Sequence, residues 1–322
     1  MARYILKRLL LSIPILFGIS LITFAVIHIT PGGPTVLQSQ MNAKMSPDSI
    51  AKLKTLYDLD KPLPVQYLKW LSRLARLDFG DSFNDNRPVT EKILERLPAT
   101  LQLNLLSLLL LFLIAVPLGV YSAAKQNSVF DRLFTSISFI GFSVPSFWLA
   151  LLLMLFFGVW LQWLPISGMA SVNSSSMPPV LQVYDRIQHL ILPLFVSVFG
   201  SIAGFSRYMR SGMLEVIRQD YIRTARAKGL PEREVLLNHA LRNALLPVIT
   251  IVGLSIPGLI SGGFIFETIF AWPGMGRLAY ESAMSFDYPV IMGVVIAGAL
   301  LTLLGNLLAD IAYAFADPRI RY

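Results

Sequence analysis

The chain alternates between long hydrophobic runs and shorter polar segments. Six runs of 21, 24, 31, 17, 23 and 22 residues contain no Asp, Glu, Lys or Arg. They are Leu9–Ile29, Leu101–Ala124, Leu133–Trp163, Leu190–Ser206, Ala244–Phe266 and Tyr288–Ala309. A helix of roughly 20 residues crosses the hydrocarbon core of a bilayer. The pattern therefore predicts an all-α polytopic membrane protein with six transmembrane helices.

Three of these runs have unusual lengths or flanks. The 31-residue run exceeds one span, so it must tilt or break, and Pro145 is the candidate break point. The 17-residue run reaches full length if it extends over Arg207 and Arg210, whose side chains can snorkel. The first run follows three basic residues, as a secretion signal does, but it exceeds the roughly 7–15 apolar residues of a signal core. We interpret it as a retained helix.

Basic residues predict the orientation of these helices. A cytoplasmic N-terminus places 15 Lys and Arg in inside segments, against only Arg186 and Arg277 in the short outside loops. Cytoplasmic loops carry such an excess of positive charge, so both termini are predicted to be cytoplasmic. The net charge of +8 then follows from membrane topology, and no nucleic-acid partner is needed to explain it.

The polar segments divide the chain into three regions. Residues 1–30 form the N-terminal segment and first helix, and 31–97 form an extracytoplasmic region with room for a few short helices. Residues 98–322 form a five-helix permease core that includes a cytoplasmic loop, 208–246. Within the core, Gln162–Gln188 contains a serine cluster and two consecutive prolines, which predict an irregular outside loop.

Catalytic motifs are missing from the sequence. There is no Gly-Lys pair, so no Walker A phosphate loop, and the three histidines are isolated without metal-site spacing. There are no cysteines to form disulfides or thiolate metal sites. We expect no catalytic residue, metal or cofactor, and any ATP hydrolysis must take place on separate nucleotide-binding subunits.

The loop between the fourth and fifth helices contains the most informative segment, Asp220-Tyr-Ile-Arg-Thr-Ala-Arg-Ala-Lys-Gly229. It predicts a short helix with Asp220 as N-cap, basic residues in the last turn and Gly229 in a left-handed conformation at the C-terminal end. Pro231 can open a second helix. The small residues Thr224, Ala225 and Ala227 leave room for another protein to approach. A solvated loop helix is the plainer alternative.

Polar residues in the spans are candidates for a translocation path. Small residues in membrane helices most often serve close packing, although hydroxyls can also line a wet path. The candidates are Asn104 in the second helix and Ser138, Ser143 and Ser146 in the third.

Several sequence words together resemble one family over nearly the whole chain: the B-type permease subunit of bacterial and archaeal ABC importers for dipeptides and oligopeptides, in the peptide/nickel group. The matching words are Tyr4–Arg8 leading into Ile13-Pro14, then Asp220–Leu230, His239–Pro247, Glu267–Arg277, Asp287–Val290 and Asp317–Arg321. The resemblance implies an all-α six-helix permease core in the plasma (inner) membrane of a prokaryote.

The resemblance also implies partners and a role for the loop helix. It implies a second homologous permease subunit, two ATP-binding subunits and an extracytoplasmic substrate-binding protein, all assembled in membrane lipid. In the family this helix couples the permease to the ATPase. The residues implied in that contact are Asp220, Tyr221, Arg223, Thr224, Ala225, Arg226, Ala227, Lys228 and Gly229.

The loop departs from the broader importer pattern E-A-A-x-x-x-G. Gly229 and Ala225 match that pattern, whereas Arg223 replaces its acidic residue and Thr224 its first alanine. The peptide branch shares these departures. As a result, no residue of this loop obviously takes the role of that acidic residue.

Two other function classes stay open at this stage. An ion-coupled secondary transporter would need intramembrane ionisable residues, for which Asp310 is the main candidate. A membrane-embedded enzyme would need a catalytic constellation, and the sequence shows none. Within the resembling family, nickel or glutathione is the alternative cargo to peptides.

The orientation is testable because the chain is free of cysteine. Single cysteines at Ser82 and Ser175 should react with an impermeant thiol reagent from outside intact cells, and one at Arg226 only from inside. Outside labelling at position 226 would reverse the predicted topology.

Overall fold

The computed structural model describes residues 2–29 and 60–316, and all regular elements there are helical apart from one isolated β-bridge, Asp81 with Pro88. The chain forms two compact units. Unit 1 comprises Met1–Thr100, Ile260–Phe264 and Pro273–Tyr322, and unit 2 comprises Leu101–Leu259 and Ile265–Trp272. The all-α prediction is confirmed.

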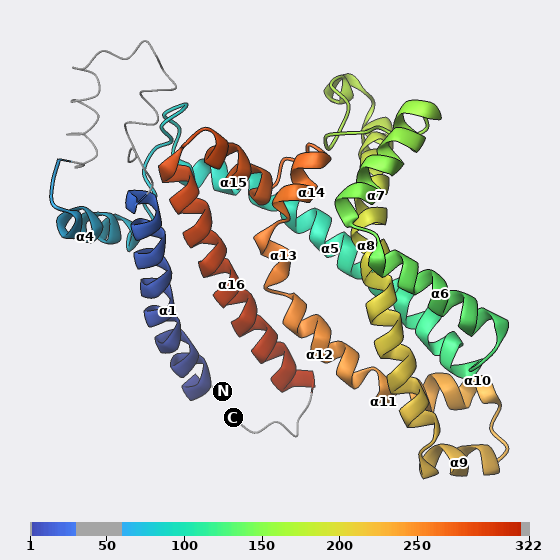
Figure 1. Ribbon diagram of the computed structural model, residues 1–322. Coiled ribbons are helices and arrows are strands. Elements are labelled where there is room, and N and C mark those ends of the chain that lie inside the picture. Colours follow the sequence, from blue (N-terminus) through green and yellow to red (C-terminus); the bar gives the residue numbers. More distant parts are fainter. Residues whose placement is uncertain (1, 30–59, 317–322) are drawn as a thin grey trace. The chain divides into compact units, whose positions relative to one another are not determined.

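Unit 1 is built on two long hydrophobic helices, α1 (Ala2–Ile29) and α16 (Tyr288–Ala316), which lie side by side (Figure 1). The short helix α4 (Leu63–Leu74) packs against α1, and α15 (Met275–Met284) packs against α16. The first residues of α5 (Val89–Ala124) also belong to this unit. An aromatic cluster that includes Phe24, Tyr67 and Tyr288 fills the space between α1, α4 and α16.

Unit 2 is built around α8 (Pro179–Ile217), which contacts α6 (Val129–Ser143), α7 (Ser146–Leu153), α11 (Leu241–Ala244) and α12 (Leu246–Ser255). The remaining elements are the π-helical turns 154–160 and 235–240, the 3-10 turn Ser174–Ser176, α9 (Asp220–Ala227), α10 (Glu232–Glu234), α13 (Gly258–Ser261) and α14 (Phe264–Ile269). Residues 260–264, from the end of α13 to the start of α14, belong to unit 1.

A glycine brings α5 and α8 into close contact. A Cβ atom on Gly119 would lie 2.6 Å from Cβ of Met209 and 2.7 Å from the carbonyl oxygen of Ser206. Only a residue without a side chain fits there, which is typical of helices that associate in membranes.

The hydrophobic runs correspond to four continuous candidate spans, on α1, α5, α8 and α16, and to six if each bent pair counts as one span. The 31-residue run breaks at Pro145 as predicted, and the helices on either side are bent by 96°. The run Ala244–Phe266 was expected to be one helix, but it is divided among α11, α12, α13 and α14. The count of six helices stays a prediction.

Helix ends differ from the sequence prediction at two places. The helix α5 begins at Val89, so residues 89–97 are helical although they were assigned to the extracytoplasmic region. The helix α8 begins at Pro179, so the irregular loop ends ten residues earlier than expected. Charged and polar turns continue these helices beyond the hydrophobic runs. Residues 30–59 and the family word Asp317–Arg321 lie outside the described residues.

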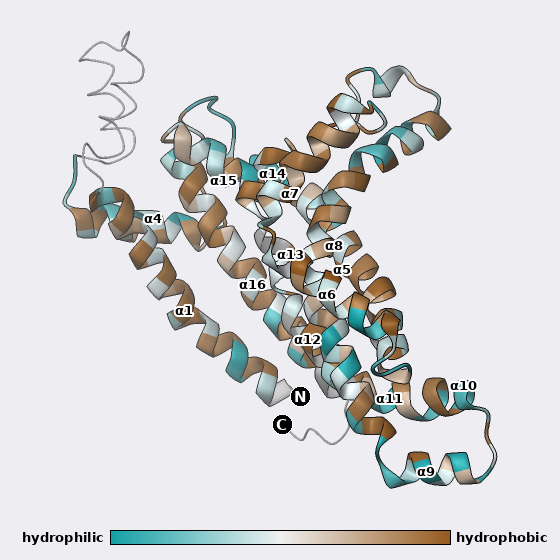
Figure 2. Ribbon diagram, turned by 45° about the vertical axis from the view of Figure 1, so that its right-hand side comes forward, coloured by the Kyte–Doolittle hydropathy of each residue, from teal (hydrophilic) through white to brown (hydrophobic). Residues whose placement is uncertain are grey.

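Exposed hydrophobic side chains agree with a bilayer environment. The helix α1 exposes Leu10, Ile13 and Ile22, and α5 exposes Leu105 and Leu109. The helix α1 is predominantly hydrophobic in Figure 2. Lipid covers such surfaces in a membrane protein, whereas a soluble protein buries them.

A buried ion pair joins α6 to α8. The carboxylate of Asp131, 3% exposed, accepts hydrogen bonds from Nε and Nη2 of Arg210 at 2.8 and 2.7 Å, and one from the hydroxyl of Ser122. Such bidentate Arg–carboxylate pairs fix geometry as well as add energy. Arg210 was expected to snorkel, but it turns to Asp131 instead.

This pair generates a stability prediction. Arg210→Gln should lower the free energy of unfolding by roughly 3 kcal/mol, because it leaves the buried carboxylate unpaired. The melting temperature of the purified protein in detergent measures the loss. The double variant with Asp131→Asn should recover part of it, and Arg132→Gln, at an exposed neighbouring position, is the control. Equal melting temperatures for Arg210→Gln and the wild type would contradict this role.

Candidate functional site

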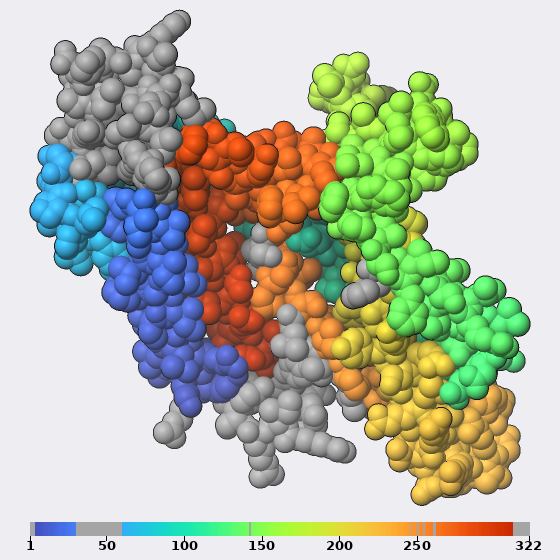
Figure 3. All heavy atoms as spheres, in the orientation of Figure 1, coloured from blue at the N-terminus to red at the C-terminus, as the bar shows by residue number. Residues whose placement is uncertain are grey.

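The helix α9 and the turns around it form a hairpin between α8 and α11, at one end of unit 2 (Figures 1 and 3). Gln219 is the N-cap, and its carbonyl accepts hydrogen bonds from the amides of Ile222 and Arg223 at 3.1 and 3.3 Å. Asp220 was expected to be the N-cap, but it is the first helical residue. Its negative charge remains at the helix N-terminus, where the dipole favours it.

The end of α9 agrees with the prediction. Lys228 is the C-cap, and Gly229 follows with φ +79°, the left-handed conformation that glycine adopts most readily. Pro231 is the N-cap of α10, so the second helix also starts where expected. That helix continues through a π-helical turn, 235–240, into α11.

Two apolar side chains anchor α9 to the rest of unit 2. Ile222 is fully buried and Ala225 is 7% exposed, three residues apart on one face of the helix. They join a hydrophobic cluster that also contains residues of α5, of α8 and of the segment from Val235 to Val248. Its other buried members are Ala123, Met209, Met213, Val235, Ala240, Ala244 and Val248. Burial of one such Ile side chain contributes about 1.5–3 kcal/mol.

This anchoring corrects the expected role of one residue. Ala225 was expected to face another protein, but its side chain is buried within its own chain. Thr224 and Ala227 are the exposed small residues of α9. Asp220, Tyr221, Arg223, Arg226, Lys228 and Gly229 are also exposed. The surface available to a partner is therefore small and polar, and carries more basic than acidic groups.

Side-chain bonds close the hairpin. Arg226 donates to both carboxylate oxygens of Glu232, at 3.0 and 2.7 Å. These bonds raise the pKa of the Arg226 guanidinium above its ordinary value, so the pair stays ionised. Asn243 donates to the hydroxyl of Tyr221 at 2.9 Å. These bonds hold α9 to α10 and to α11, and they leave the outward face of α9 exposed.

The four path candidates do not share one environment. The amide of Asn104, on α5, donates to the carbonyl of Leu259 at 2.7 Å. Leu259 lies in α13, one of the short pieces into which the run Ala244–Phe266 is divided. Ser138 is 8% exposed and lines a recess between α6 and α8. Ser143 donates to the carbonyl of Phe139 within its own helix, and Ser146 is exposed. Ser138 is thus the candidate that borders a recess of unit 2.

The loop of unit 1 that precedes α5 is held by Asp287, which is 1% exposed. Its carboxylate accepts from the hydroxyl of Ser82 at 2.6 Å and from the amide of Phe83 at 3.0 Å. Asn84 donates to Ser285 at 2.8 Å. Ser82 is fully buried by these contacts, so it is a poor labelling site, and the exposed Asn84 is the better one for the topology experiment.

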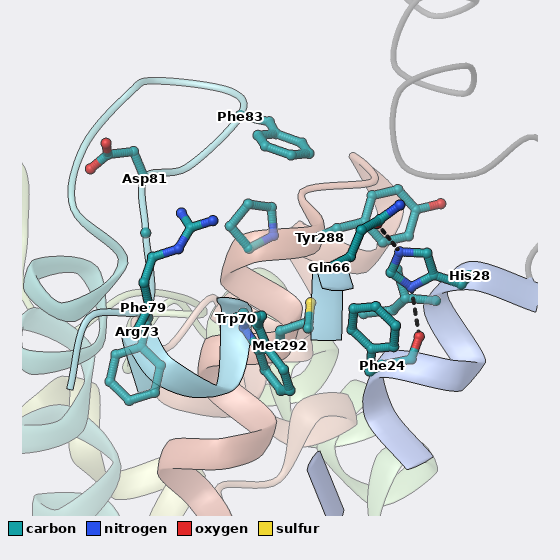
Figure 4. A pocket seen from close by; sticks show the side chains of 13 residues that line it. Phe24, His28, Gln66, Trp70, Arg73, Phe79, Asp81, Phe83, Tyr288 and Met292 are labelled. Atoms are coloured by element: carbon teal, nitrogen blue, oxygen red, sulfur yellow. Dashed lines mark hydrogen bonds between the residues drawn. The ribbon is translucent and has the colours of Figure 1, made fainter. Parts of the chain in front are cut away.

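Unit 1 also contains a small aromatic pocket of about 90 Å³ between α1, α4 and α16 (Figure 4). His28 lies at its edge, between the carbonyl of Phe24 at 2.8 Å and the side chain of Gln66 at 3.1 Å. Trp70 and Tyr288 add aromatic walls. Aromatic residues of this kind gather at membrane–water interfaces, which fits the position of α4 after the first membrane helix.

Asp310, on which a secondary-transporter interpretation depends, is engaged in an ion pair. Its carboxylate lies 3.0 Å from Nη2 of Arg8, which joins α16 to α1. Within the described residues, no group of three His, Cys, Asp or Glu is placed to hold a metal ion. The geometry favours a structural role for Asp310.

Two features were missed in the sequence. The partner of Arg210 lies 79 positions away, so no local pattern indicates it. The inward direction of α9 was visible in principle, because Ile222 is the one large aliphatic residue of that helix and Ala225 lies three positions further on.

Comparison with known proteins gives concordant results. Residues 115–322 match the family model described as binding-protein-dependent transport system inner membrane component, and residues 1–104 match the model for the N-terminal part of such components. The oligopeptide transport system permease protein AppB of Bacillus subtilis is 48% identical over all of both chains. The dipeptide transport system permease protein DppB of Escherichia coli is 37% identical over 100% of this chain and 99% of that protein.

A solved structure shares the fold. A chain of the MetNI methionine ABC transporter, in an inward-facing conformation, aligns with a TM-score of 0.50 and 18% identity. The alignment covers 69% of this chain and 96% of that one.

The left-handed glycine generates a local prediction. Gly229→Val should fray the end of α9 and raise hydrogen exchange in residues 222–230, because a β-branched residue disfavours φ +79° by at least about 1–2 kcal/mol. No atom lies within 4 Å of the position of the new Cβ, so the effect is conformational and not a clash. Gly229→Asn, which tolerates this conformation, is the matched control. Wild-type exchange in the Val variant would show that the cap does not hold the helix.

Proposed function

Because the chain belongs to the family of binding-protein-dependent transport system inner membrane components, we propose that it is one permease subunit of an ATP-driven importer and that α9 is its contact with an ATPase subunit. The observation that carries this proposal is the construction of α9. Its apolar face is anchored by Ile222 and Ala225, and its small, polar and basic face is left uncovered. A force applied to that face is passed directly to α8.

The energy for transport comes from other subunits. The sequence contains no Gly-Lys pair and so no Walker A loop to bind ATP phosphates. Two ATP-binding subunits, one for each of two permease subunits, would close on ATP and tilt the permeases against each other. The second permease would be a homologous but different chain, so that the pair forms a heterodimer in the lipid bilayer with the translocation path between its members.

Peptides are the proposed cargo. The relatives named above are described as dipeptide and oligopeptide permeases, and they align with this chain from end to end. An extracytoplasmic substrate-binding protein would deliver the cargo to the outside loops, which include Gln162–Gln188 and Glu267–Tyr288. Both termini and the α9 hairpin are then cytoplasmic. Of the path candidates, Ser138 is best placed to meet cargo, because it borders a recess in unit 2.

The coupling surface can be tested on its exposed side. Ala227→Trp should reduce co-purification of the ATPase subunits by roughly tenfold or more, about 1.4 kcal/mol of binding free energy, because an indole ring would hold the partner away. Uptake of a dipeptide by the reconstituted importer should fall with it, while membrane insertion and melting temperature stay unchanged.

Two matched variants sharpen the experiment. Ser175→Trp adds the same ring at an exposed position before α8 and should retain the ATPases. Ala225→Trp should instead lower the melting temperature, because it forces a ring into a packed cluster. ATPase association and uptake at wild-type levels in Ala227→Trp would exclude this face of α9 as the contact. Stoichiometric binding of ATP to the isolated subunit would exclude the proposal that other subunits bind and hydrolyse the ATP.

A further inference from the structure

The groove between α6 and α8 contains two arginines in very different states. Arg210 is neutralised by Asp131 through two hydrogen bonds. Arg207, almost one turn earlier on α8, has no carboxylate within 4.0 Å among the described residues. Its guanidinium instead lies 4.3 Å from the centre of the Phe139 ring. The groove therefore presents one positive charge that no acidic side chain of the described chain balances.

Two recesses adjoin each other here, and Arg207 and Phe139 line both of them. One has a volume of about 420 Å³ and is also lined by Gly204, Tyr208 and Ser211. The other has a volume of about 240 Å³ and is lined by hydroxyls as well as aromatic rings, including Thr135, Ser138 and Ser206. The larger volume falls within the roughly 300–1,000 Å³ typical of small-molecule sites. Hydroxyls and a guanidinium together suit a carboxylate ligand.

The α8 wall of the groove around Arg207 is polar, whereas the α6 wall exposes apolar side chains such as Ile137, Phe139 and Ile140. Between Ser197 and Leu214, the exposed residues of α8 are Ser201, Arg207, Tyr208 and Ser211. The neighbouring glycines at 200 and 204 have no atom within 4 Å of where a Cβ would lie. By contrast, α5 exposes a row of leucines, at 101, 105, 109 and 113, of the kind that lipid covers. This face of α8 is therefore suited to water and polar cargo.

We infer that Arg207 is a cargo-binding residue of the translocation path, which attracts the carboxylates of a passing peptide into the groove between α6 and α8. The inference rests on the proposed function. The terminal carboxylate and terminal ammonium of a dipeptide offset each other in charge, so the guanidinium favours cargo by the charge of its side chains. An acidic side chain gives the cargo a second carboxylate and should increase the effect.

The test compares two dipeptides in the complete importer reconstituted in liposomes with saturating binding protein. Ala-Glu and Ala-Lys are supplied together, and the ratio of their initial uptake rates is measured. Arg207→Gln should lower the Ala-Glu to Ala-Lys ratio roughly tenfold, corresponding to one lost charge-assisted hydrogen bond. Arg207→Lys should keep the ratio within roughly twofold, because a point charge remains. Arg132→Gln removes an exposed arginine of α6 and should leave the ratio unchanged.

A second pair of variants covers the case in which Arg207→Gln does not fold. Ser211→Glu places a negative charge in the larger recess and should lower the ratio, whereas Ser211→Lys should raise it. An unchanged ratio in Arg207→Gln and in the Ser211 pair, with uptake intact, would overturn the inference and leave the proposed function standing. A fall that is equal for both peptides would likewise overturn it, since a structural or lipid-binding arginine behaves in that way. Absence of ATP-dependent uptake by the wild type would overturn the proposed function and the inference with it.

Discussion

Backbone polar groups inside a bilayer must find partners within the protein, and this constraint governs the structure. It explains why the described spans are helical and why two of their interruptions keep the backbone hydrogen-bonded. The carbonyl of Leu259, near the break before α14, accepts a hydrogen bond from Asn104 of α5. The chain leaves regular α-geometry at Met154–Trp160 through a π-helical turn, which keeps the backbone bonded. Polar side chains in the spans are thus partly a consequence of bent helices.

The same constraint explains which parts of the fold could be predicted from the sequence. Long apolar runs have one stable solution in lipid, so α1, α5, α8 and α16 were all anticipated. The ends of α5 and α8 were not, because outside the hydrocarbon core a helix can continue through charged turns at little cost. Pro145 broke its helix as expected, since proline removes a backbone donor. The run Ala244–Phe266 was predicted as one helix, yet it contains Pro257 and four glycines, and tertiary contacts divide it into short pieces.

The candidate site was predictable in position and less so in orientation. Local chemistry placed α9 to within one residue at its start, because caps and left-handed glycines leave signals over three or four positions. Which face of α9 turns inward depends on Met209, Met213 and Val235, which come from other elements. The contrast between the two arginines of α8 was beyond sequence reasoning for the same reason. It depends on an aspartate far away in the chain, whose carboxylate can satisfy one guanidinium and not both.

The length of α8 has a mechanical consequence. Its 39 residues extend about 58 Å at 1.5 Å per residue, and the α9 hairpin is fastened to one end of it. A rigid rod of that length tilted by about 10° at the hairpin displaces its far end by about 10 Å. Pro193 lies within the helix and cannot donate to the carbonyl of His189, so the helix can bend at this point. Bending there would reduce the displacement of the far end, so the stiffness of α8 at Pro193 determines how much of a rotation at the hairpin reaches the other end of the helix.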